Sequence, residues 1–225
     1  MSENKRDASS GPDPVAEMFT SLRAALAAGA VLPAEVETAR CCAFFHQLGI
    51  DQDKSGALLI GMAMQGGTPE DAALLRLLML LGSPAARERA RTALGELTAK
   101  GVYPSSWVAE AGKAEPVRAL RVPGESGDWE DIHITFRYAS GEHTLVARVD
   151  LADPPVARQL TLIEGEMPAE QDRPSTSSSQ ELSLAGARAR LEPALLANES
   201  DGFLPPDAAA LTPIAKSRLR RLPAS

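Results

Sequence analysis

Hydrophobic residues recur at helical spacing through the first hundred residues of the chain. The first such run consists of Val15, Met18, Phe19, Leu22 and Leu26. Residues at this spacing share one face of a helix. Asp13-Pro14 stands just before the run and supplies a side-chain acceptor at the cap and a proline at the first helical position. The pattern therefore predicts a helix over residues 14–29.

Four further helices are predicted over residues 33–49, 51–65, 68–82 and 83–100. Thr68-Pro69-Glu70-Asp71 is a capping signature for the third of these, and Ser83-Pro84 begins the last. Leucines surround the helix over 68–82 on almost every side, so we expect it at the centre, covered by the amphipathic helix that follows. Residues 13–101 are predicted to form a helical bundle. The polar residues 1–12 are predicted to be a disordered tail.

The pattern changes to strict alternation after Pro116. Apolar residues alternate with polar ones on both sides of Ser140-Gly141, which lies where a hairpin turn is needed. A turn centred there predicts an antiparallel pair that joins Phe136 with Leu145 and Ile132 with Val149. Residues 117–122 and 156–163 are predicted to be further strands, so that residues 102–164 form a small antiparallel sheet.

The last third of the chain returns to helical spacing after a polar segment. Residues 165–183 include a run of serines and are predicted to be a flexible linker. Residues 184–225 are predicted to form helices that pack on the sheet. The fold class predicted from the whole pattern is α+β, with a helical bundle first, an antiparallel sheet second and helices at the C-terminus.

Charge and composition disfavour several classes of function. The formal net charge is −7, the isoelectric point is near 5.1 and aromatic residues make up 4% of the chain. Nucleic-acid binding needs clustered cations and favours aromatic platforms, so it is disfavoured. The sequence has no apolar run long enough to span a bilayer and no apolar segment typical of a secretory signal. Its cysteines, Cys41 and Cys42, are chain neighbours and predict no disulfide framework, which favours the cytoplasm.

Several short motifs of the chain resemble those of a family of uncharacterised actinobacterial proteins. The motifs are Tyr103-Pro104-Ser105-Ser106-Trp107, then Phe136-Arg137-Tyr138 with Gly141-Glu142-His143-Thr144-Leu145 and Val149-Asp150, then Ala187-Arg188-Ala189-Arg190-Leu191-Glu192-Pro193-Ala194-Leu195, then Arg218-Leu219-Arg220-Arg221-Leu222-Pro223. The resemblance covers about half of the chain. It implies an architecture, with an Ala/Leu-rich helical front, a tryptophan motif, a hairpin and closing helices. It implies no activity.

The polar face of the predicted hairpin carries the most concentrated candidate chemistry. In the predicted register Asp131 lies opposite Asp150, and His133 lies opposite Arg148. Two carboxylates beside an imidazole are ligands for a divalent metal, or an acid–base pair. The alternative is a solvated sheet face on which an aspartate pairs with Arg148. We favour that alternative, and assign no catalytic, cofactor-binding or metal residue beyond the candidates Asp131, His133 and Asp150.

Two other features of the chain are candidate sites. Cys42 and His46 lie four residues apart on one helix face, which allows half a metal site or a nucleophile with a base, but packing is the favoured interpretation. Lys216, Arg218, Arg220 and Arg221 make the C-terminal helix basic. They suit the helix dipole, and phosphate contact is the alternative.

The function predicted from the sequence is that of a non-enzymatic cytoplasmic interaction or regulatory protein. The expected partner is a protein or a second copy of the chain, with no membrane, no cofactor and no evident small-molecule substrate. Two alternatives stay open. One is a metal-dependent hydrolase-like enzyme that uses the hairpin face, and the other is a nucleic-acid-associated regulator that uses the basic C-terminal helix.

Overall fold

The computed structural model describes residues 13–165, 179–200 and 206–224, so the predicted tail over residues 1–12 lies outside it. The predicted N-terminal helices are confirmed. They are α1 (Pro14–Ala28), α2 (Val31–Gln47), α3 (Gln52–Gly66), α4 (Pro69–Leu81) and α5 (Pro84–Ala99). Side chains of Asp13, Asp51, Thr68 and Ser83 accept backbone N–H groups at the starts of α1, α3, α4 and α5. Helix α2 begins two residues before Pro33, which then lies in the first turn, where a missing N–H costs nothing.

Helix α4 is the central helix, as its leucines predict. Leu74, Leu75, Leu77 and Leu78 are each 0% exposed, and α5 packs along the helix. Thr68 and Asp71 form the predicted capping box at its start. A short 3-10 helix, η1 (Ser106–Glu110), follows the bundle. We call residues 14–110 the helical half.

An antiparallel sheet follows, and the α+β fold class is confirmed. Within the described residues the strands are β1 (Glu115–Pro123), β2 (Trp129–Tyr138), β3 (Gly141–Asp150), β4 (Val156–Glu164) and β5 (Gln180–Leu182). Their order across the sheet is β4-β3-β2-β1-β5. Strand β5 lies inside the segment predicted to be a linker, and pairs with β1 through Ala119 and Leu182. Residues 166–178 of that segment lie outside the described part.

The predicted register of the hairpin is wrong by two residues. Tyr138 pairs with Gly141, Phe136 with His143, and Asp131 with Arg148. The turn residues are therefore Ala139-Ser140, and Gly141 is already the first residue of β3. Because side chains alternate with a period of two, this slip keeps every residue on its predicted face. Ile132, Ile134 and Leu145 are accordingly buried.

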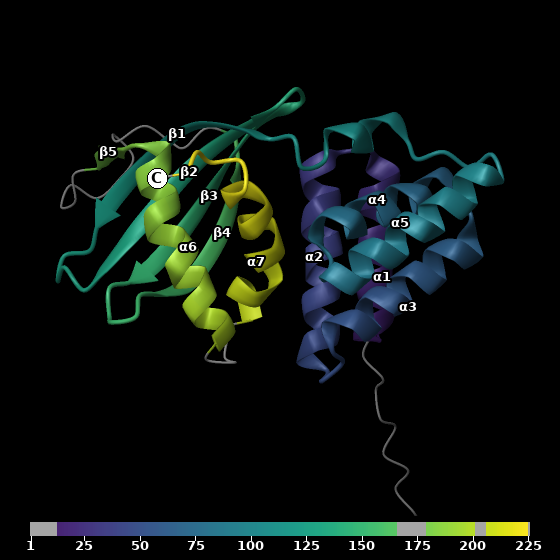
Figure 1. Ribbon diagram of the computed structural model, residues 1–225, viewed down its shortest axis with the longest axis horizontal. Helices are drawn as coiled ribbons and strands as arrows, with labels where there is room; N and C mark the ends of the chain where they lie inside the picture. Colours follow the sequence, from purple (N-terminus) through teal and green to yellow (C-terminus); the bar gives the residue numbers. More distant parts are fainter. Residues whose placement is uncertain (1–12, 166–178, 201–205, 225) are drawn as a thin grey trace, which may run out of the picture.

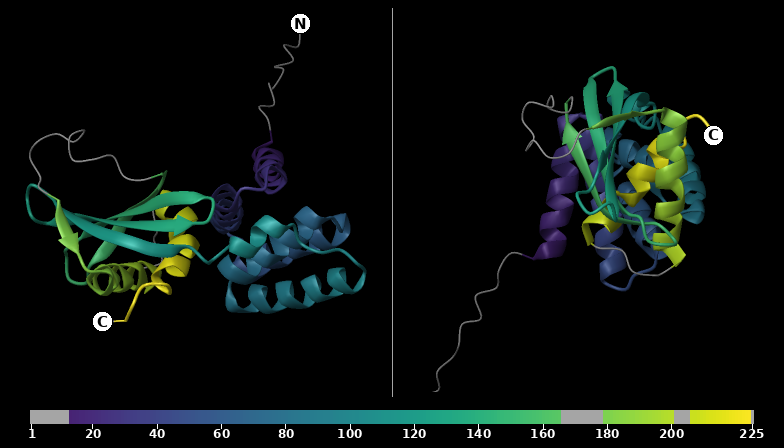
Figure 2. Two further views of the ribbon diagram at one scale, coloured as in Figure 1. Left: turned by 90° about the horizontal axis from the view of Figure 1, so that it is seen from above. Right: turned by 90° about the vertical axis from the view of Figure 1, so that its left-hand side faces the viewer.

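The C-terminal helices cover one face of the sheet. They are α6 (Leu184–Ser200) and α7 (Pro206–Leu219). Figure 1 and Figure 2 show α6 lying across the strands and α7 between the sheet and α2. We call residues 115–222 the sheet half.

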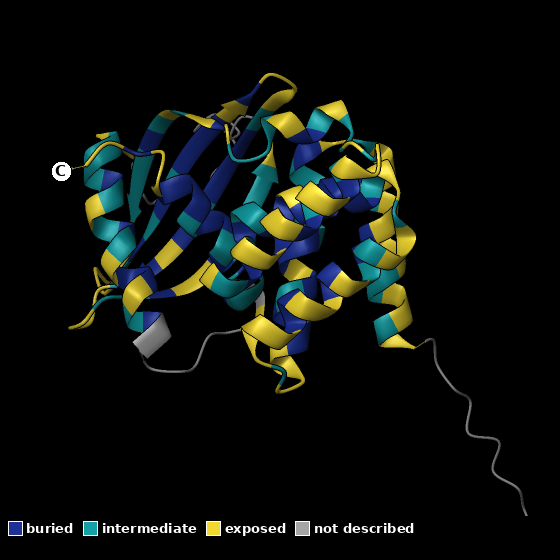
Figure 3. Ribbon diagram, turned by 45° about the vertical axis from the view of Figure 1, so that its right-hand side comes forward, coloured by how far each residue is buried: buried dark blue, intermediate teal, exposed yellow. Residues whose placement is uncertain are grey.

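The joint between the halves is formed mainly by α2 and α7. An apolar cluster at the joint joins Ala39 of α2, Leu81 of α4 and Ile214 of α7. Figure 3 shows the buried residues on the strands and on the inner sides of the helices. Helix α7 belongs to the sheet half and packs on α2 of the helical half. Its side chains can therefore contact residues of both halves.

Candidate functional site

The two candidate aspartates of the hairpin form ion pairs with arginines. Arg148 donates from Nε and Nη2 to the two carboxylate oxygens of Asp131, each at 2.9 Å. Arg158 of β4 donates to Oδ2 of Asp150 at 3.2 and 3.1 Å. The predicted pairings of Asp131 with Asp150 and of His133 with Arg148 are wrong, since His133 lies opposite Val146. The slip of two residues places a cation opposite Asp131 instead of a second carboxylate.

The electrostatics of this face also oppose acid–base chemistry. The backbone N–H of Ala152, followed by Arg158, lowers the pKa of Asp150. The Asp131 carboxylate raises the pKa of Arg148, whose guanidinium also lies 4.2 Å from the ring centroid of Trp129. Across the described residues no group of three or more His, Cys, Asp or Glu side chains is arranged to hold a metal. On this face each of the two candidate aspartates is paired with an arginine.

A buried polar cluster that the sequence did not predict lies at the joint. It consists of Glu35 of α2, Tyr138 of β2, His143 of β3 and Arg218 of α7. Arg218 donates from Nη2 to Glu35 at 2.5 Å and from Nε to Nε2 of His143 at 3.1 Å, and it also donates to the Tyr138 hydroxyl. Tyr138 donates to Glu35 at 2.7 Å, and the backbone N–H of Gly112 donates to the other carboxylate oxygen at 3.0 Å.

Burial sets the protonation states in this cluster. Glu35 and Arg218 are 0% exposed and His143 is 1% exposed. Desolvation, followed by the charge of Arg218, lowers the pKa of His143 to about 3. Burial likewise raises the pKa of Tyr138. His143 is therefore neutral and accepts at Nε2, so its hydrogen is on Nδ1. The cluster holds α2, the sheet and α7 together, and its groups do not face solvent.

A second buried carboxylate lies under α6. Glu130 is 0% exposed and accepts from Nε of Arg121 at 2.5 Å and from Nη1 of Arg190 at 2.9 Å. These pairs fasten α6 to β1 and β2. Since both oxygens of Glu130 are engaged by guanidinium groups, we assign Glu130 a structural role.

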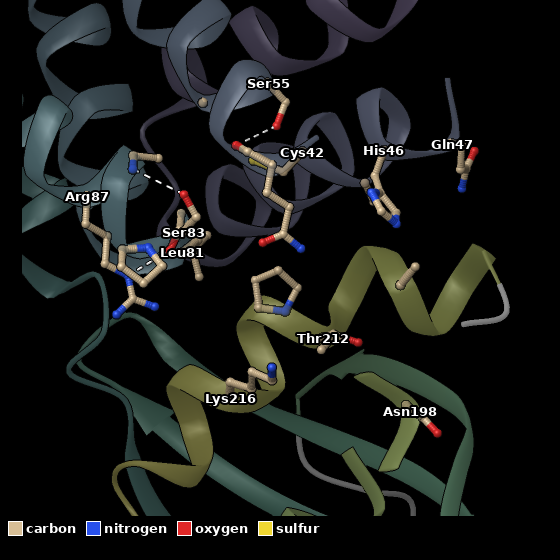
Figure 4. A pocket seen from close by; sticks show the side chains of 18 of the residues that line it. Cys42, His46, Gln47, Ser55, Leu81, Ser83, Arg87, Asn198, Thr212 and Lys216 are labelled. Carbon is tan, nitrogen blue, oxygen red and sulfur yellow. Dashed lines mark hydrogen bonds between the residues drawn. The ribbon is translucent and has the colours of Figure 1, made fainter. Parts of the chain in front are cut away.

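A cleft of about 570 Å³ opens at the joint, between α7 and the helices of the helical half (Figure 4). Cys42 and His46 both line it, as does Ser55 from the first turn of α3. The other lining residues come from α2, from α3, from the end of α4, the turn after it and the start of α5, and from α6 and α7. They are Ala43, Gln47, Gln52, Gly56, Leu81, Gly82, Ser83, Pro84, Ala86, Arg87, Asn198, Pro206, Ala209, Thr212, Pro213 and Lys216.

The polar groups of this cleft favour binding over nucleophilic catalysis. Burial raises the pKa of the Cys42 thiol to about 11, so the reactive thiolate is scarce at neutral pH. His46 lines the cleft and is exposed. Arg87 extends from α5 and Lys216 from α7, on facing walls. The cleft thus combines an apolar wall with cations and a protonated thiol.

The sequence predicted only part of this cleft. Cys42 and His46 are predicted to share a helix face, and the structure places both in the cleft. Arg218 is one of the basic C-terminal residues that the sequence offers to phosphate, but it is fully buried. Lys216 of the same segment lines the cleft instead. The burial of Arg218 and the position of Lys216 in the cleft wall depend on how α7 packs between the sheet and α2, which the sequence does not show.

No protein-family model, curated protein or solved structure matches this chain. The resemblance to uncharacterised actinobacterial proteins therefore stays a prediction. Among the described residues, no helix has the length and apolar character needed to cross a membrane.

Proposed function

We propose that this chain is a non-enzymatic cytoplasmic interaction or regulatory protein whose binding site is the cleft at the joint. The observation that carries the proposal is that the lining comes from both halves, with Cys42 and Arg87 on one side and Lys216 on the other. An occupant touches both halves at once. Its binding free energy therefore favours the arrangement of the halves in which all of these contacts are made.

The chemistry of the cleft supports binding as its role. The Cys42 thiol is protonated at neutral pH, because burial raises its pKa to about 11. The cytoplasmic placement rests on Cys41 and Cys42, which are free thiols and are held in the reduced form in that compartment. Self-association through the leucines of α4 is not part of the proposal, because those side chains are buried within the chain.

The test blocks the cleft and leaves the rest of the surface intact. Ala209 of α7 lines the cleft and is half-buried, so Ala209→Trp fills part of its volume. Ala210→Trp is the matched control, because Ala210 is the next residue of α7, is also half-buried and does not line the cleft. Wild type and both variants are used as baits in host extract, and circular dichroism and thermal unfolding establish that each bait is folded.

We expect a protein partner that wild type and Ala210→Trp retain and Ala209→Trp loses. Equal capture by all three baits contradicts the proposal, as does the absence of any partner specific to the folded protein. A rise in melting temperature on titration with Zn²⁺ or Mg²⁺ that Asp131→Asn abolishes supports the metal-dependent alternative instead, since specific binding stabilises the native state.

A further inference from the structure

Contact between the halves is concentrated toward the N-terminal end of α2. Val31, the first residue of this helix, packs in the apolar core of the sheet half. Glu35 joins the buried polar cluster one turn later, and Ala39 packs in the apolar cluster at the joint. Cys42 and Gln47, near the other end of α2, line the cleft instead. The halves therefore meet closely over the first part of α2, and the cleft borders its last turns.

Helix α7 shows the same change along its length, in the opposite direction. Arg218 contacts Glu35 and Ile214 packs with Ala39, so α7 runs antiparallel to α2 (Figure 1). Pro206, at the start of α7, lines the cleft. Helices α3 and α5 contribute the opposite wall, across the cleft from α7 (Figure 4). The cleft thus separates α7 from one side of the helical half.

The chain crosses between the halves at the closely packed end. Residues 111–114 make this crossing, which lies at the top of the joint in Figure 1. The backbone N–H of Gly112 donates to Glu35 at 3.0 Å, and Ala114 is 0% exposed in the core of the sheet half. Gly112 has a φ of +71°, which glycine adopts without strain. The covalent link and the polar cluster are therefore together at one end of the joint, and the cleft is at the other.

The apolar contact between the halves is small beside the core of each half. Helix α7 belongs to the core of the sheet half through Ala208, Ala215 and Leu219, and the helical half has a core of its own. The separate cluster at the joint is built on Ala39 and Ile214, together with Leu81. Parts of a chain that have separate cores and a small, partly polar contact are expected to move relative to each other.

We infer that the joint is a hinge with its pivot at Val31, Glu35 and Gly112, and that the two halves close on an occupant of the cleft. This inference rests on the proposed function and describes how the same site responds to its occupant. An occupant that contacts α7 and α3 together favours the arrangement in which these helices are closest. The angle between the halves then depends on whether the cleft is filled, and a partner that spans the joint can sense it.

The geometry of α2 sets the size of the expected motion. Gln47 lies sixteen positions after Val31, which corresponds to about 24 Å along a helix. A rotation of about 10–15° at the pivot therefore moves the cleft end by about 4–6 Å and the pivot end very little.

Pairs of spin labels on the full chain measure this motion by double electron–electron resonance. The pair at the cleft end is Gln47→Cys with Pro206→Cys, and the pair at the pivot end is Ala30→Cys with Arg221→Cys. All four residues are exposed. Each pair has one label at an end of α2 and the other at the neighbouring end of α7, so the two pairs differ only in the end of the joint that they span.

A third pair gives the width of the distance distribution that label motion alone produces. It is Gln47→Cys with Ala99→Cys, two exposed positions within the helical half. Cys42→Ser removes the thiol of the cleft from all labelled chains, and Cys41 is kept because it is 0% exposed. Circular dichroism and thermal unfolding establish that each labelled chain is folded.

We expect the cleft-end distribution to be broader than that of the third pair by about 4–6 Å, and the pivot-end distribution to be as narrow as that of the third pair. Ala209→Trp places a bulky side chain in the cleft as a fixed occupant, so it should narrow the cleft-end distribution. Ala210→Trp should leave that distribution unchanged.

A narrow cleft-end distribution means that the joint is rigid, and a broad pivot-end distribution means that the halves separate as a whole. Either result overturns the hinge. A broad cleft-end distribution that Ala209→Trp does not narrow overturns closure on an occupant. These distances are measured without any partner, whereas capture by the Ala209→Trp and Ala210→Trp baits decides whether the cleft is an interaction site. The hinge and the proposed function therefore fail separately.

Discussion

The pairs Glu35–Arg218 and Asp131–Arg148 have the same chemistry and opposite surroundings. In the first pair both side chains lie at the joint and are shielded from water, with side-chain exposures of 0% and 1%. In the second, on the outer face of the sheet, the Arg148 side chain is 44% exposed. When a buried charge loses its partner, no water can take the partner's place. When an exposed charge loses its partner, water solvates it instead. The two pairs should therefore differ sharply in what their loss costs.

The position of the buried pair shows what it does for the fold. Glu35 belongs to α2 and Arg218 to α7, and the Tyr138 hydroxyl contacts both. Hydrogen bonds require particular angles between donor and acceptor, so the cluster fixes the orientation of one half relative to the other. The apolar contact of Ala39 with Ile214 is not directional and does not fix that orientation. The pair on the outer face joins two strands that the backbone ladder already joins.

The largest expected effect is that of Arg218→Met. The substitution leaves the Glu35 carboxylate buried with only the Tyr138 hydroxyl and the Gly112 N–H as partners. We expect the free energy of unfolding to fall by about 3–5 kcal/mol, measured by urea denaturation. The double variant Glu35→Leu with Arg218→Met removes both charges and should regain most of that loss. A loss below about 1 kcal/mol in the single variant contradicts the contrast between buried and exposed pairs.

The second effect is a dependence of stability on pH that comes from His143. Its pKa is lowered to about 3 in the folded protein, from the ordinary histidine value of 6.5 that the unfolded chain keeps. Below pH 6.5 the unfolded chain therefore binds more protons than the folded one, and stability falls as the pH is lowered toward 3. For this residue alone the loss between about pH 7.5 and about pH 5 is about 2 kcal/mol.

The contribution of His143 is isolated by comparing variants, because Glu35, Tyr138 and Arg218 face it and carboxylates elsewhere also titrate. His143→Gln keeps an acceptor for Nε of Arg218 and removes the titrating ring. We expect a shallower decline of unfolding free energy below pH 6.5 in this variant than in wild type. His46→Gln, which replaces an exposed histidine, is the control and should keep the wild-type decline. Parallel curves for wild type and His143→Gln contradict the prediction.

The fold was predictable where local signals determine it. The caps at Asp13-Pro14, Thr68 and Ser83 locate the starts of helices because they satisfy N–H groups within the same few residues. Alternation likewise predicted which side chains of β2 and β3 face inward. The register was not predictable from Gly141 alone, because a glycine can occupy the turn or begin the strand.

The buried cluster and the cleft were not predictable, because they depend on contacts between distant segments. Glu35 lies in an ordinary helical run, and its partner Arg218 stands 183 positions later. Nothing near either residue in the sequence indicates the other. Arg218 was expected to be solvated, since a cation near the C-terminal end of a helix suits the dipole whether or not it is buried.

Tyr138→Phe tests how much the cluster depends on its hydroxyl, and its expected effect is smaller. The change removes the hydrogen bond to Glu35 at 2.7 Å and the acceptor for Arg218, but leaves the buried charges paired with each other. We expect a loss of about 1–2 kcal/mol in unfolding free energy, measured by urea denaturation. Tyr103→Phe is the matched control, because Tyr103 is 64% exposed, and it should change stability by less than about 0.5 kcal/mol. Equal effects of the two variants contradict the importance of the hydroxyl.

The smallest effect is expected for the exposed pair. Asp131→Asn removes the charge that Arg148 contacts, and water then solvates the guanidinium, which keeps its contact with Trp129. A double-mutant cycle of Asp131→Asn with Arg148→Met should give a coupling energy below about 1 kcal/mol. Salt screens exposed charges, so the coupling should shrink further at about 1 M salt, while the cost of Arg218→Met changes little.

A coupling as large as that of the buried pair, or one that salt does not alter, means that the outer face of the sheet is shielded from water. Asp131 would then again be a candidate for the metal-dependent role.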